Sequence, residues 1–306
     1  MLILIAGVSG NLGKFLAEFG LESGHQIRGF GRSPSKLPPK LLNKLESFVQ
    51  CEHYDDRLAL DKAASGVDAV ICSYGSHADA ILDAQLSLLR AVERAGIKIY
   101  HAHSWNFDWT KICFGEWEHY DAYISFRRQV ELTSSIKPVY TFTGILGEFA
   151  LNEMTGIAYL KEDGDGKVFT HWGSGDAQWD FTYLEDAARF TIKLITTHKS
   201  VLAGNGGFFN IHSGEANAKD VAKAYEKITG EKVKLRSLGD LEKLKTNLEH
   251  ARATMDIQKY FLYGNYYIQT AVILGAWKLE NPVKVGGLDA VERLFDSQIE
   301  IPADYL

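Results

Sequence analysis

The sequence predicts an α/β protein built on a doubly wound parallel sheet, with a smaller C-terminal α+β lobe. Two observations carry this prediction. Short apolar runs alternate with segments of helical spacing through the first half of the chain, as in consecutive βαβ units. The first run, Leu2–Ala6, has no polar residue and leads directly into a glycine-rich turn, which is typical of a parallel strand covered on both faces.

The first half of the chain follows this alternation closely. We expect strands at residues 2–6, 26–30, 47–51, 69–73 and 98–102, and helices at 14–23, 58–64 and 81–95. Gly24 and Gly96 directly follow two of these helices and are expected to end them.

The second half is less regular. We expect helices at 120–135, 184–196, 218–229, 238–247, 254–275 and 287–295, strands at 139–142, 167–172 and 207–212, and a loop or short helix from 147 to 154. Asp180 and Thr182 are interpreted as residues that turn the chain and cap the next helix. We expect one domain over residues 1–150 and the lobe over 151–306, with a soft boundary that lets some segments return to the sheet.

The composition excludes several classes of protein. The 306 residues are 46% hydrophobic and 24% charged, an ordinary globular balance that excludes disorder and fibrous rods. Three scattered cysteines do not make a disulfide framework. The net charge of −6 gives no electrostatic reason to expect nucleic acid as a partner.

The chain is expected to be cytoplasmic. The apolar Leu2–Ala6 run is short, has no basic segment before it, and is interpreted as a strand rather than a signal peptide. The apolar stretch at 270–277 is too short to span a bilayer. We therefore expect no membrane partner.

A Gly-x-x-Gly-x-x-Gly turn at Gly7, Gly10 and Gly13 indicates a dinucleotide site of the Rossmann type. It follows a predicted strand and begins a predicted helix, so the backbone can approach a pyrophosphate at the helix N-terminus. The residues expected to contact the dinucleotide here are Gly7, Ser9, Gly10, Asn11, Leu12 and Gly13. The alternative is a structural glycine turn without a ligand.

The end of the second strand indicates NADP rather than NAD. No carboxylate for a ribose hydroxyl occurs there, whereas Arg32, Ser33 and Lys36 can hold a 2′-phosphate. The alternative is that these charges are only solvated surface groups. Further cofactor contacts are expected at the ends of later strands, from Ser73, Tyr74, Gly75, Phe142 and Gly144.

Together these features resemble the NmrA-like and isoflavone-reductase-like group of atypical short-chain dehydrogenases. The resemblance rests on the glycine turn, Arg32 and Lys36, and on residues 67–73, 85–98, 127–131, 144–149, 180–186 and 209–212. It implies a Rossmann domain that binds NADP(H) and a smaller lobe that closes over a substrate cleft.

The chain departs from this group in two places. Residues 102–106 replace a Pro-Ser-Glu-Phe-Gly-like segment and keep only an aromatic, Trp105. The catalytic lysine of the isoflavone-reductase-like enzymes lies one helical turn before the paired arginines, where this chain has Tyr123. The usual acid–base group is therefore missing or moved.

Tyr123, Arg127 and His103 are the catalytic candidates. Tyr123 and Arg127 have the spacing of the Tyr-x-x-x-Lys pair of the classical dehydrogenases, and a cation one turn away favours the phenolate of a general acid. The alternative is a packed tyrosine followed by surface arginines. His103 follows the fifth strand, where ligands of α/β proteins bind. His101, His103 and His119 do not have the spacing of a metal-binding cluster, so no metal is expected.

Aromatic residues suggest a pocket for a bulky substrate, although half or more of them are expected to be core. The candidates are Trp105, Phe107, Phe149, Trp172, Trp179, Phe261 and Tyr266. The sequence thus predicts an NADP(H)-dependent oxidoreductase acting on a hydrophobic, aromatic or polycyclic small molecule in natural-product biosynthesis, redox-triggered cyclisation included. The alternative is a non-catalytic NADP-binding redox sensor of the NmrA-like type.

Overall fold

The computed structural model describes residues 1–75, 77–153, 155, 157–163, 166–254, 263–296 and 298–299. The chain divides into two compact units. Residues 1–105, 109–142 and 184–209 form the first unit, and residues 106–108, 143–183 and 210–306 form the second. The first unit thus extends beyond the expected boundary near residue 150, because the helix that begins at Leu184 returns to it, as the soft boundary allowed, and packs against the first helix.

The main sheet has the order β14-β11-β6-β5-β4-β1-β2-β3. Its strands are β1 (Leu2–Ala6), β2 (Gln26–Gly31), β3 (Ser47–Gln50), β4 (Ala69–Cys72), β5 (Ile99–His101), β6 (Val139–Phe142), β11 (Gly207–His212) and β14 (Val283–Lys284). The described pairings within it are parallel, which confirms the predicted doubly wound sheet. The direction of the order reverses at β1, between β2 and β4, where ligands of such sheets bind.

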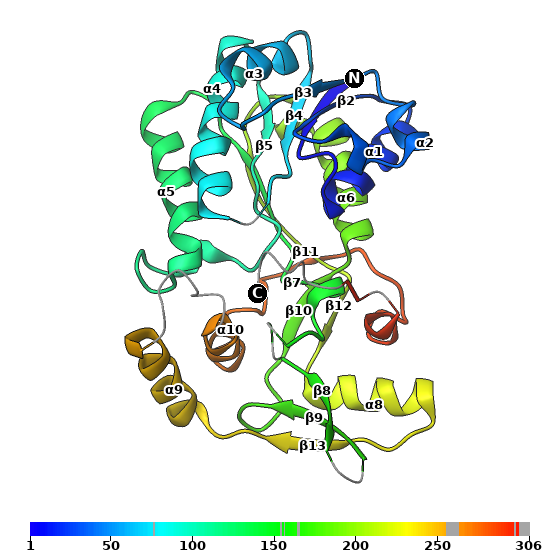
Figure 1. Ribbon diagram of the computed structural model, residues 1–306, viewed down its shortest axis with the longest axis vertical. Helices are drawn as coiled ribbons and strands as arrows, with labels where there is room; N and C mark the ends of the chain where they lie inside the picture. Colours follow the sequence, from blue (N-terminus) through cyan, green and yellow to red (C-terminus); the bar gives the residue numbers. More distant parts are fainter. Residues whose placement is uncertain are drawn as a thin grey trace. The chain divides into compact units, whose positions relative to one another are not determined.

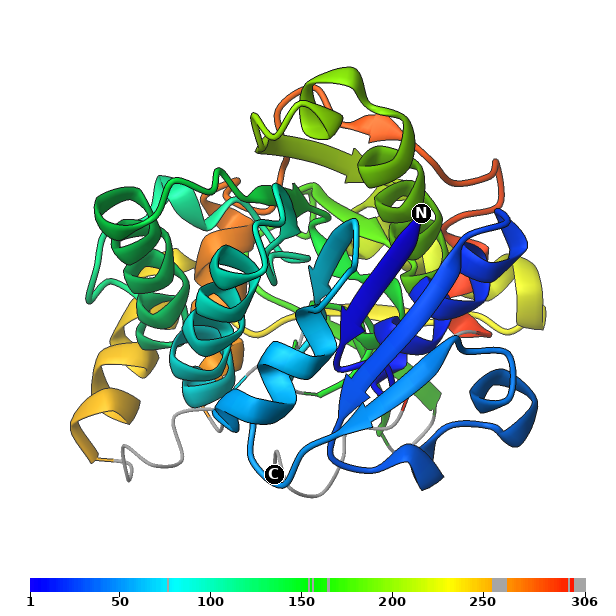
Figure 2. The same ribbon diagram turned by 90° about the horizontal axis from the view of Figure 1, so that it is seen from above.

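Helices cover both faces of this sheet in the first unit (Figures 1 and 2). They are α1 (Asn11–Glu22), α2 (Pro39–Leu42), α3 (Arg57–Ala64), α4 (Gln85–Arg94), α5 (Glu118–Thr133), α6 (Leu184–Thr197) and α7 (Lys199–Leu202). Helices α1 and α6 lie on one face, and α3, α4 and α5 on the other. A π-helical turn, Ala80–Ala84, precedes α4, and 3-10 turns occur at Pro34–Lys36 and Trp109–Lys111.

The centre of the sheet forms the core of the first unit. Ile3, Leu4 and Ile5 of β1 are fully buried, as an apolar run between two neighbouring strands requires. Gly20 lets α1 approach the sheet closely, because a Cβ there would lie 2.5 Å from the end of the Ile27 side chain on β2.

The second unit contains two three-stranded sheets among its described residues, in the orders β12-β10-β7 and β13-β9-β8. The strands are β7 (Ile145–Leu146), β8 (Tyr159–Asp163), β9 (Gly166–His171), β10 (Trp179–Thr182), β12 (Gly214–Ala216) and β13 (Lys234–Ser237). The helices are α8 (Ala218–Thr229), α9 (Leu241–Thr254) and α10 (Gly264–Ile273), with 3-10 turns at Gly147–Phe149 and Glu292–Phe295. The helix predicted at 287–295 is therefore reduced to a single turn.

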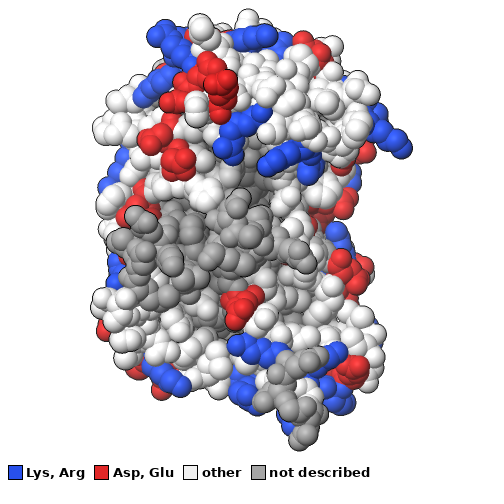
Figure 3. Space-filling view, viewed as in Figure 1, with Lys and Arg blue, Asp and Glu red and all other residues white. Residues whose placement is uncertain are grey.

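The charged side chains of the first unit are partly paired. Arg94 of α4 bonds Asp61 of α3 at 2.5 Å, and Arg28 of β2 bonds Glu46 at 3.0 Å. Figure 3 shows acidic and basic side chains interspersed on one face of the molecule. No helix among the described residues is long and apolar enough to cross a bilayer.

Candidate functional site

The glycine turn between β1 and α1 is packed so tightly that side chains are excluded from two of its positions. A Cβ on Gly7 would lie 2.2 Å from the Ser73 carbonyl oxygen, and the φ of Gly7 is +84°. A Cβ on Gly13 would lie 2.3 Å from the Gly7 carbonyl oxygen. Gly10 is less confined, because its Cβ would meet that same oxygen at 3.2 Å. Gly7 and Gly13 therefore shape the turn, whereas Gly10 leaves a bare stretch of backbone.

The N-terminus of α1 provides the electrostatic part of this arrangement. Its N-cap is Gly10, no side chain among the described residues caps it, and its first turn contains no acidic residue. Asn11 and Leu12 occupy the start of the helix, and Ser9 lies just before it. Free N–H groups and the positive end of the helix dipole suit an anion such as a pyrophosphate.

The end of β4 lies directly beside the turn. The Ser73 N–H donates to the Ala6 carbonyl at 2.8 Å, which continues the pairing of β4 with β1 by one residue. Ser73 and Tyr74 are buried, whereas Gly75 is exposed. Gly7 follows β1, and Ser73–Gly75 follow β4. The carboxyl ends of these two neighbouring strands, where the strand order reverses, thus bring the two segments together.

Arg32, after the end of β2, is held by aromatic contacts. Its guanidinium lies 4.9 Å from the centroid of the Tyr54 ring, and the Tyr54 ring lies 4.4 Å from the Tyr74 ring. Burial raises the pKa of Tyr54, although the Arg32 charge opposes this shift, so the phenol stays neutral. Ser33 and Lys36 follow Arg32 at the surface or half-buried. The contact of Tyr54 with Arg32 is not predicted from the sequence, because no sequence motif links the two positions.

His103 lies two residues beyond β5. Its Nδ1 is buried and has no hydrogen-bond partner among the described residues, and burial lowers the pKa of its imidazole to about 4. Its backbone N–H donates to Oε1 of Gln85 at 2.6 Å. A neutral imidazole at the end of a central strand can donate a hydrogen bond to a ligand, but it carries no second proton at neutral pH.

Tyr123 lies beside His103 within a cluster of rings. Its ring centroid is 5.6 Å from that of His103 and 5.9 Å from that of His119, whose pKa burial lowers to about 4. The Trp109 ring contacts Tyr123 from 5.6 Å. Tyr123 is only 2% exposed, so its phenol lies inside this cluster rather than at the surface of the first unit. The structure therefore brings both predicted proton donors together.

Arg127 lies one turn after Tyr123 on α5, as predicted, but its side chain contacts other residues. Its Nε bonds Glu131 at 2.7 Å, and its guanidinium lies 5.1 Å from the Phe208 ring. It lines a hollow of about 210 Å³ together with Trp109, Thr110, Ile112, Ile124, Arg128 and Glu131. The guanidinium of Arg127 is therefore paired with the Glu131 carboxylate and lies over the Phe208 ring. These contacts do not support its predicted role in activating Tyr123.

His101 is a core residue. Its Nδ1 contacts the Ala102 carbonyl at 2.8 Å and its Nε2 contacts Thr141 Oγ1 at 2.9 Å, while its ring stacks on Trp105 at 4.5 Å. Burial lowers the pKa of His101 to about 3. Among the described residues, no group of three or more His, Cys, Asp or Glu side chains is arranged to hold a metal ion.

Comparison with known proteins identifies the family. The profile of the NmrA-like family matches residues 1–286. The chain belongs to the NmrA-like family. It is 29% identical over 202 residues to an isoflavone reductase homolog of Arabidopsis thaliana, an alignment that covers 63% of this chain and 64% of that protein. It is 24% identical over 249 residues to the bifunctional pinoresinol-lariciresinol reductase of Linum usitatissimum, covering 77% of each chain.

A solved structure supports the fold of this NmrA-like chain along nearly its whole length. The binary complex of leucoanthocyanidin reductase with NADPH from Vitis vinifera superposes with a TM-score of 0.74. The alignment covers 97% of this chain and 99% of that one, at 19% identity. The likeness confirms the Rossmann-like fold predicted from the strand pattern and the glycine turn.

Two further residues of the predicted cofactor site, Phe142 and Gly144, have packing contacts in the structure. The Phe142 ring of β6 contacts Trp109 at 5.6 Å and Phe208 at 5.9 Å. Gly144 belongs to the second unit, and a Cβ there would lie 2.0 Å from the Asp180 carbonyl oxygen. Both residues pack within their own units, and their contacts with the cofactor stay a prediction.

The predicted substrate residues divide between core and partly exposed positions. In the first unit, Trp105 is buried and its Nε1 donates to Thr191 Oγ1 at 3.1 Å. In the second unit, Phe107 packs on Trp277 at 5.1 Å and Trp179 packs on Phe181 at 5.5 Å. These three residues are buried, as expected for half or more of the aromatic candidates, and their contact with a substrate stays a prediction.

Three other predicted substrate residues, Phe149, Trp172 and Tyr266, lie in the second unit, and their contact with a substrate stays a prediction. Phe149 and Tyr266 are half-buried, and the Trp172 ring meets Tyr266 edge-on at 6.4 Å. The Lys243 Nζ lies 5.9 Å from the centroid of the Trp172 ring. Phe261 lies outside the described residues.

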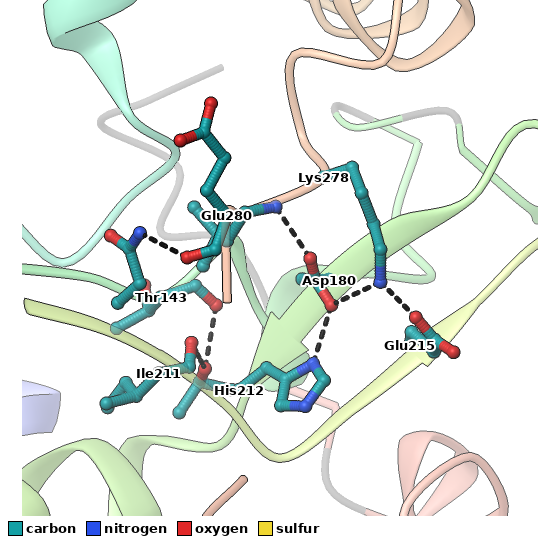
Figure 4. A network of polar contacts seen from close by, with 10 residues as sticks. Thr143, Asp180, Ile211, His212, Glu215, Lys278 and Glu280 are labelled. Atoms are coloured by element: carbon teal, nitrogen blue, oxygen red, sulfur yellow. Dashed lines mark hydrogen bonds and ion pairs between the residues drawn. The ribbon is translucent and has the colours of Figure 1, made fainter. Parts of the chain in front are cut away.

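Asp180 and Thr182 do not cap a helix as predicted, because both lie in β10. The Asp180 carboxylate is fully buried and accepts hydrogen bonds from His212 Nδ1 at 2.6 Å, the Leu279 N–H at 2.7 Å and Lys278 Nζ at 3.1 Å (Figure 4). Lys278 also pairs with Glu215. Thr182 Oγ1 donates to the Thr143 carbonyl at 2.7 Å. This network holds β10, β11 and the 278–279 segment together within the second unit.

Proposed function

We propose that this NmrA-like chain is an NADP(H)-dependent reductase of a small aromatic molecule. The observation that carries the proposal is the glycine turn, whose packing excludes side chains at Gly7 and Gly13 and leaves an uncapped helix N-terminus. Such a cradle fits a pyrophosphate. The NADPH-bound leucoanthocyanidin reductase with the same fold, and the reductase names of the relatives, support the same cofactor and chemistry.

The pyrophosphate and the 2′-phosphate of the cofactor each have candidate contacts in the first unit. Gly10 and the start of α1, with Ser9, Asn11 and Leu12, would hold the pyrophosphate, and the Ser73–Gly75 segment lies beside them. Arg32, held over Tyr54, would bind the 2′-phosphate, with Ser33 and Lys36 nearby. Bound NADPH would supply the hydride.

The protein would supply the proton through His103 and Tyr123. The neutral imidazole of His103, at the end of a central strand, would hydrogen-bond the substrate atom that gains the proton. The Tyr123 phenol, whose ring centroid lies 5.6 Å from that of His103, would then supply the proton. These two residues would replace the lysine that this chain lacks.

The substrate class follows from the relatives and from the aromatic residues of the second unit. The relatives are named for isoflavones and pinoresinol, which are aromatic compounds. Tyr266 and Phe149 offer half-buried rings against which such a compound could pack, and the buried Trp172 meets Tyr266 edge-on. We further propose that the reaction belongs to natural-product metabolism and includes a redox-triggered cyclisation of the substrate.

The test is a NADPH oxidation assay on the purified chain. An isoflavone, pinoresinol and a quinone are offered with NADPH or NADH, and loss of reduced cofactor is followed. We expect turnover of at least one compound with NADPH preferred, and a fall in kcat of roughly 10²–10⁴ for His103→Phe. If NADPH binds and no compound is reduced, the enzyme proposal fails and the redox-sensor function is favoured.

A further inference from the structure

Gln85 is a fully buried polar side chain on the otherwise apolar face of α4. It shares this face with Leu88, Leu89 and Val92, which are also fully buried. Its side-chain Nε2 donates to the Ile81 carbonyl at 2.7 Å, and its Oε1 accepts from the His103 N–H at 2.6 Å. Both ends of the amide are used, which fixes its orientation.

The backbone before Gln85 is unusual. Residues Ala80–Ala84 form a π-helical turn, and α4 begins at Gln85 itself. Single π-helical turns are rare and occur frequently at functional sites. The Ile81 carbonyl that binds the Gln85 amide belongs to this turn, so the shape of the turn and the position of the side chain are coupled.

His103 needs this contact because the strand ladder ends before it. The strand β5 ends at His101, and the Ala102 N–H donates to the Val139 carbonyl of β6 at 2.9 Å. The N–H of His103, which lies two residues beyond the end of β5, donates to the side chain of Gln85. Gln85 therefore takes the place of a strand neighbour at the residue whose imidazole meets Tyr123.

We propose that Gln85 is a positioning residue that fixes the backbone of His103, and thereby holds its imidazole beside Tyr123 for proton transfer. The inference rests on the proposed function. Gln85 acts through His103 and is not itself given a contact with substrate or cofactor. A purely structural Gln85 would stabilise the fold without affecting the chemical step.

The experiment compares variants at Gln85 in the full chain, using the compound reduced fastest in the assay above. Gln85→Met keeps the length of the side chain and removes both polar ends. We expect kcat to fall roughly ten- to hundredfold, with KM and the Kd for NADPH unchanged, because misplacing a reacting group by a small distance has effects of that size. Gln85→Glu keeps an acceptor oxygen for the His103 N–H and should restore most of kcat. Leu88→Val, a buried change one turn along α4, should lower the melting temperature without changing kcat.

A double-mutant cycle with His103→Phe separates positioning from general destabilisation. If Gln85 acts through His103, Gln85→Met lowers kcat in the wild-type chain but not in the His103→Phe chain. The inference is overturned if Gln85→Met lowers kcat equally in both chains, or changes only the melting temperature. Absence of activity in the wild-type chain would instead contradict the proposed function.

Discussion

The Arg32 guanidinium lies over the Tyr54 ring, 4.9 Å from its centroid, and Tyr54 in turn packs against Tyr74 at 4.4 Å. This row of side chains joins the end of β2 to the end of β4, the two strands on either side of β1. An arginine stacked on a ring loses less conformational entropy when it binds a phosphate, because its plane is already oriented. In the proposed binding mode, Tyr54 orients Arg32 for the 2′-phosphate and so affects cofactor selectivity.

Arg32→Ala should weaken NADPH binding far more than NADH binding. Only NADPH offers the 2′-phosphate, and a charge-assisted contact contributes about 1.5–3 kcal/mol, or ten- to a hundredfold in Kd. Titration calorimetry with both cofactors measures the difference. A wild-type chain that prefers NADH, or an unchanged NADPH affinity in the variant, would contradict the assignment.

Tyr54→Leu should weaken NADPH binding by a smaller factor and leave NADH binding unchanged. The change removes the ring beneath Arg32, and a cation–π contact at a partly exposed site contributes about 0.5–1 kcal/mol, or severalfold in Kd. Tyr54→Phe keeps the ring and is the matched control, with wild-type Kd values expected. Equal losses in both variants would mean that the hydroxyl, rather than the ring, is responsible.

The contrast between Arg32 and Tyr54 shows which parts of the site could be predicted from the sequence. The glycine turn and Arg32 were predicted because each is fixed by a local pattern, a strand followed by a turn and a helix. Tyr54 and Gln85 depend on contacts between segments distant in sequence, and no spacing encodes these. The sequence offers one indication for Gln85, which is that a polar residue lies on the apolar face of a predicted helix. From the sequence, this position is predicted only to be part of that helix.

The second half of the chain was harder for a related reason. Asp180-Phe181-Thr182 has the residues of a helix cap but forms β10, because the Asp180 carboxylate finds its partners in His212 and Lys278, far along the chain. The short strands β7 and β12 have only two or three residues and no alternating pattern to detect. Their positions depend on pairing with β10.

Gly10→Val should abolish dinucleotide binding while the chain remains folded. A Cβ at Gly10 meets its nearest atom at 3.2 Å, which a small shift relieves, but the β-branched side chain would occupy the pyrophosphate position. Gly13→Ala is the informative contrast, since its Cβ would lie 2.3 Å from a backbone oxygen and should lower the melting temperature. Calorimetry that detects NADPH binding by Gly10→Val would show that the turn is not the phosphate cradle.

Asp180→Asn should destabilise the chain at neutral pH and reduce its sensitivity to acid. Burial alone would raise the pKa of Asp180, but hydrogen bonds from His212, the Leu279 N–H and Lys278 outweigh it and hold the pKa below its usual value. The stabilisation is therefore present above about pH 4 and is lost as the pH falls through the lower pKa of the folded state. We expect a loss of about 1–3 kcal/mol in the free energy of unfolding at pH 7, measured by urea denaturation. Equal losses at pH 7 and at pH 3 would contradict an ionised Asp180.

The chain should lose stability in mild acid, well above the range in which its carboxylates titrate. Burial lowers the pKa of His101 to about 3, and those of His103 and His119 to about 4, whereas an unfolded histidine has a pKa of about 6.5. Below about pH 6.5 the unfolded chain binds protons that the folded chain does not, so the free energy of unfolding falls with pH, by up to about 1.4 kcal/mol per pH unit for each such histidine. Urea denaturation at pH 7, 6 and 5 measures this slope. His119→Phe keeps an aromatic ring in the cluster and should reduce the slope. A stability that stays constant from pH 7 to pH 5 would mean that these imidazoles are accessible to protons in the folded state, and that His103 could serve as a cationic proton donor after all.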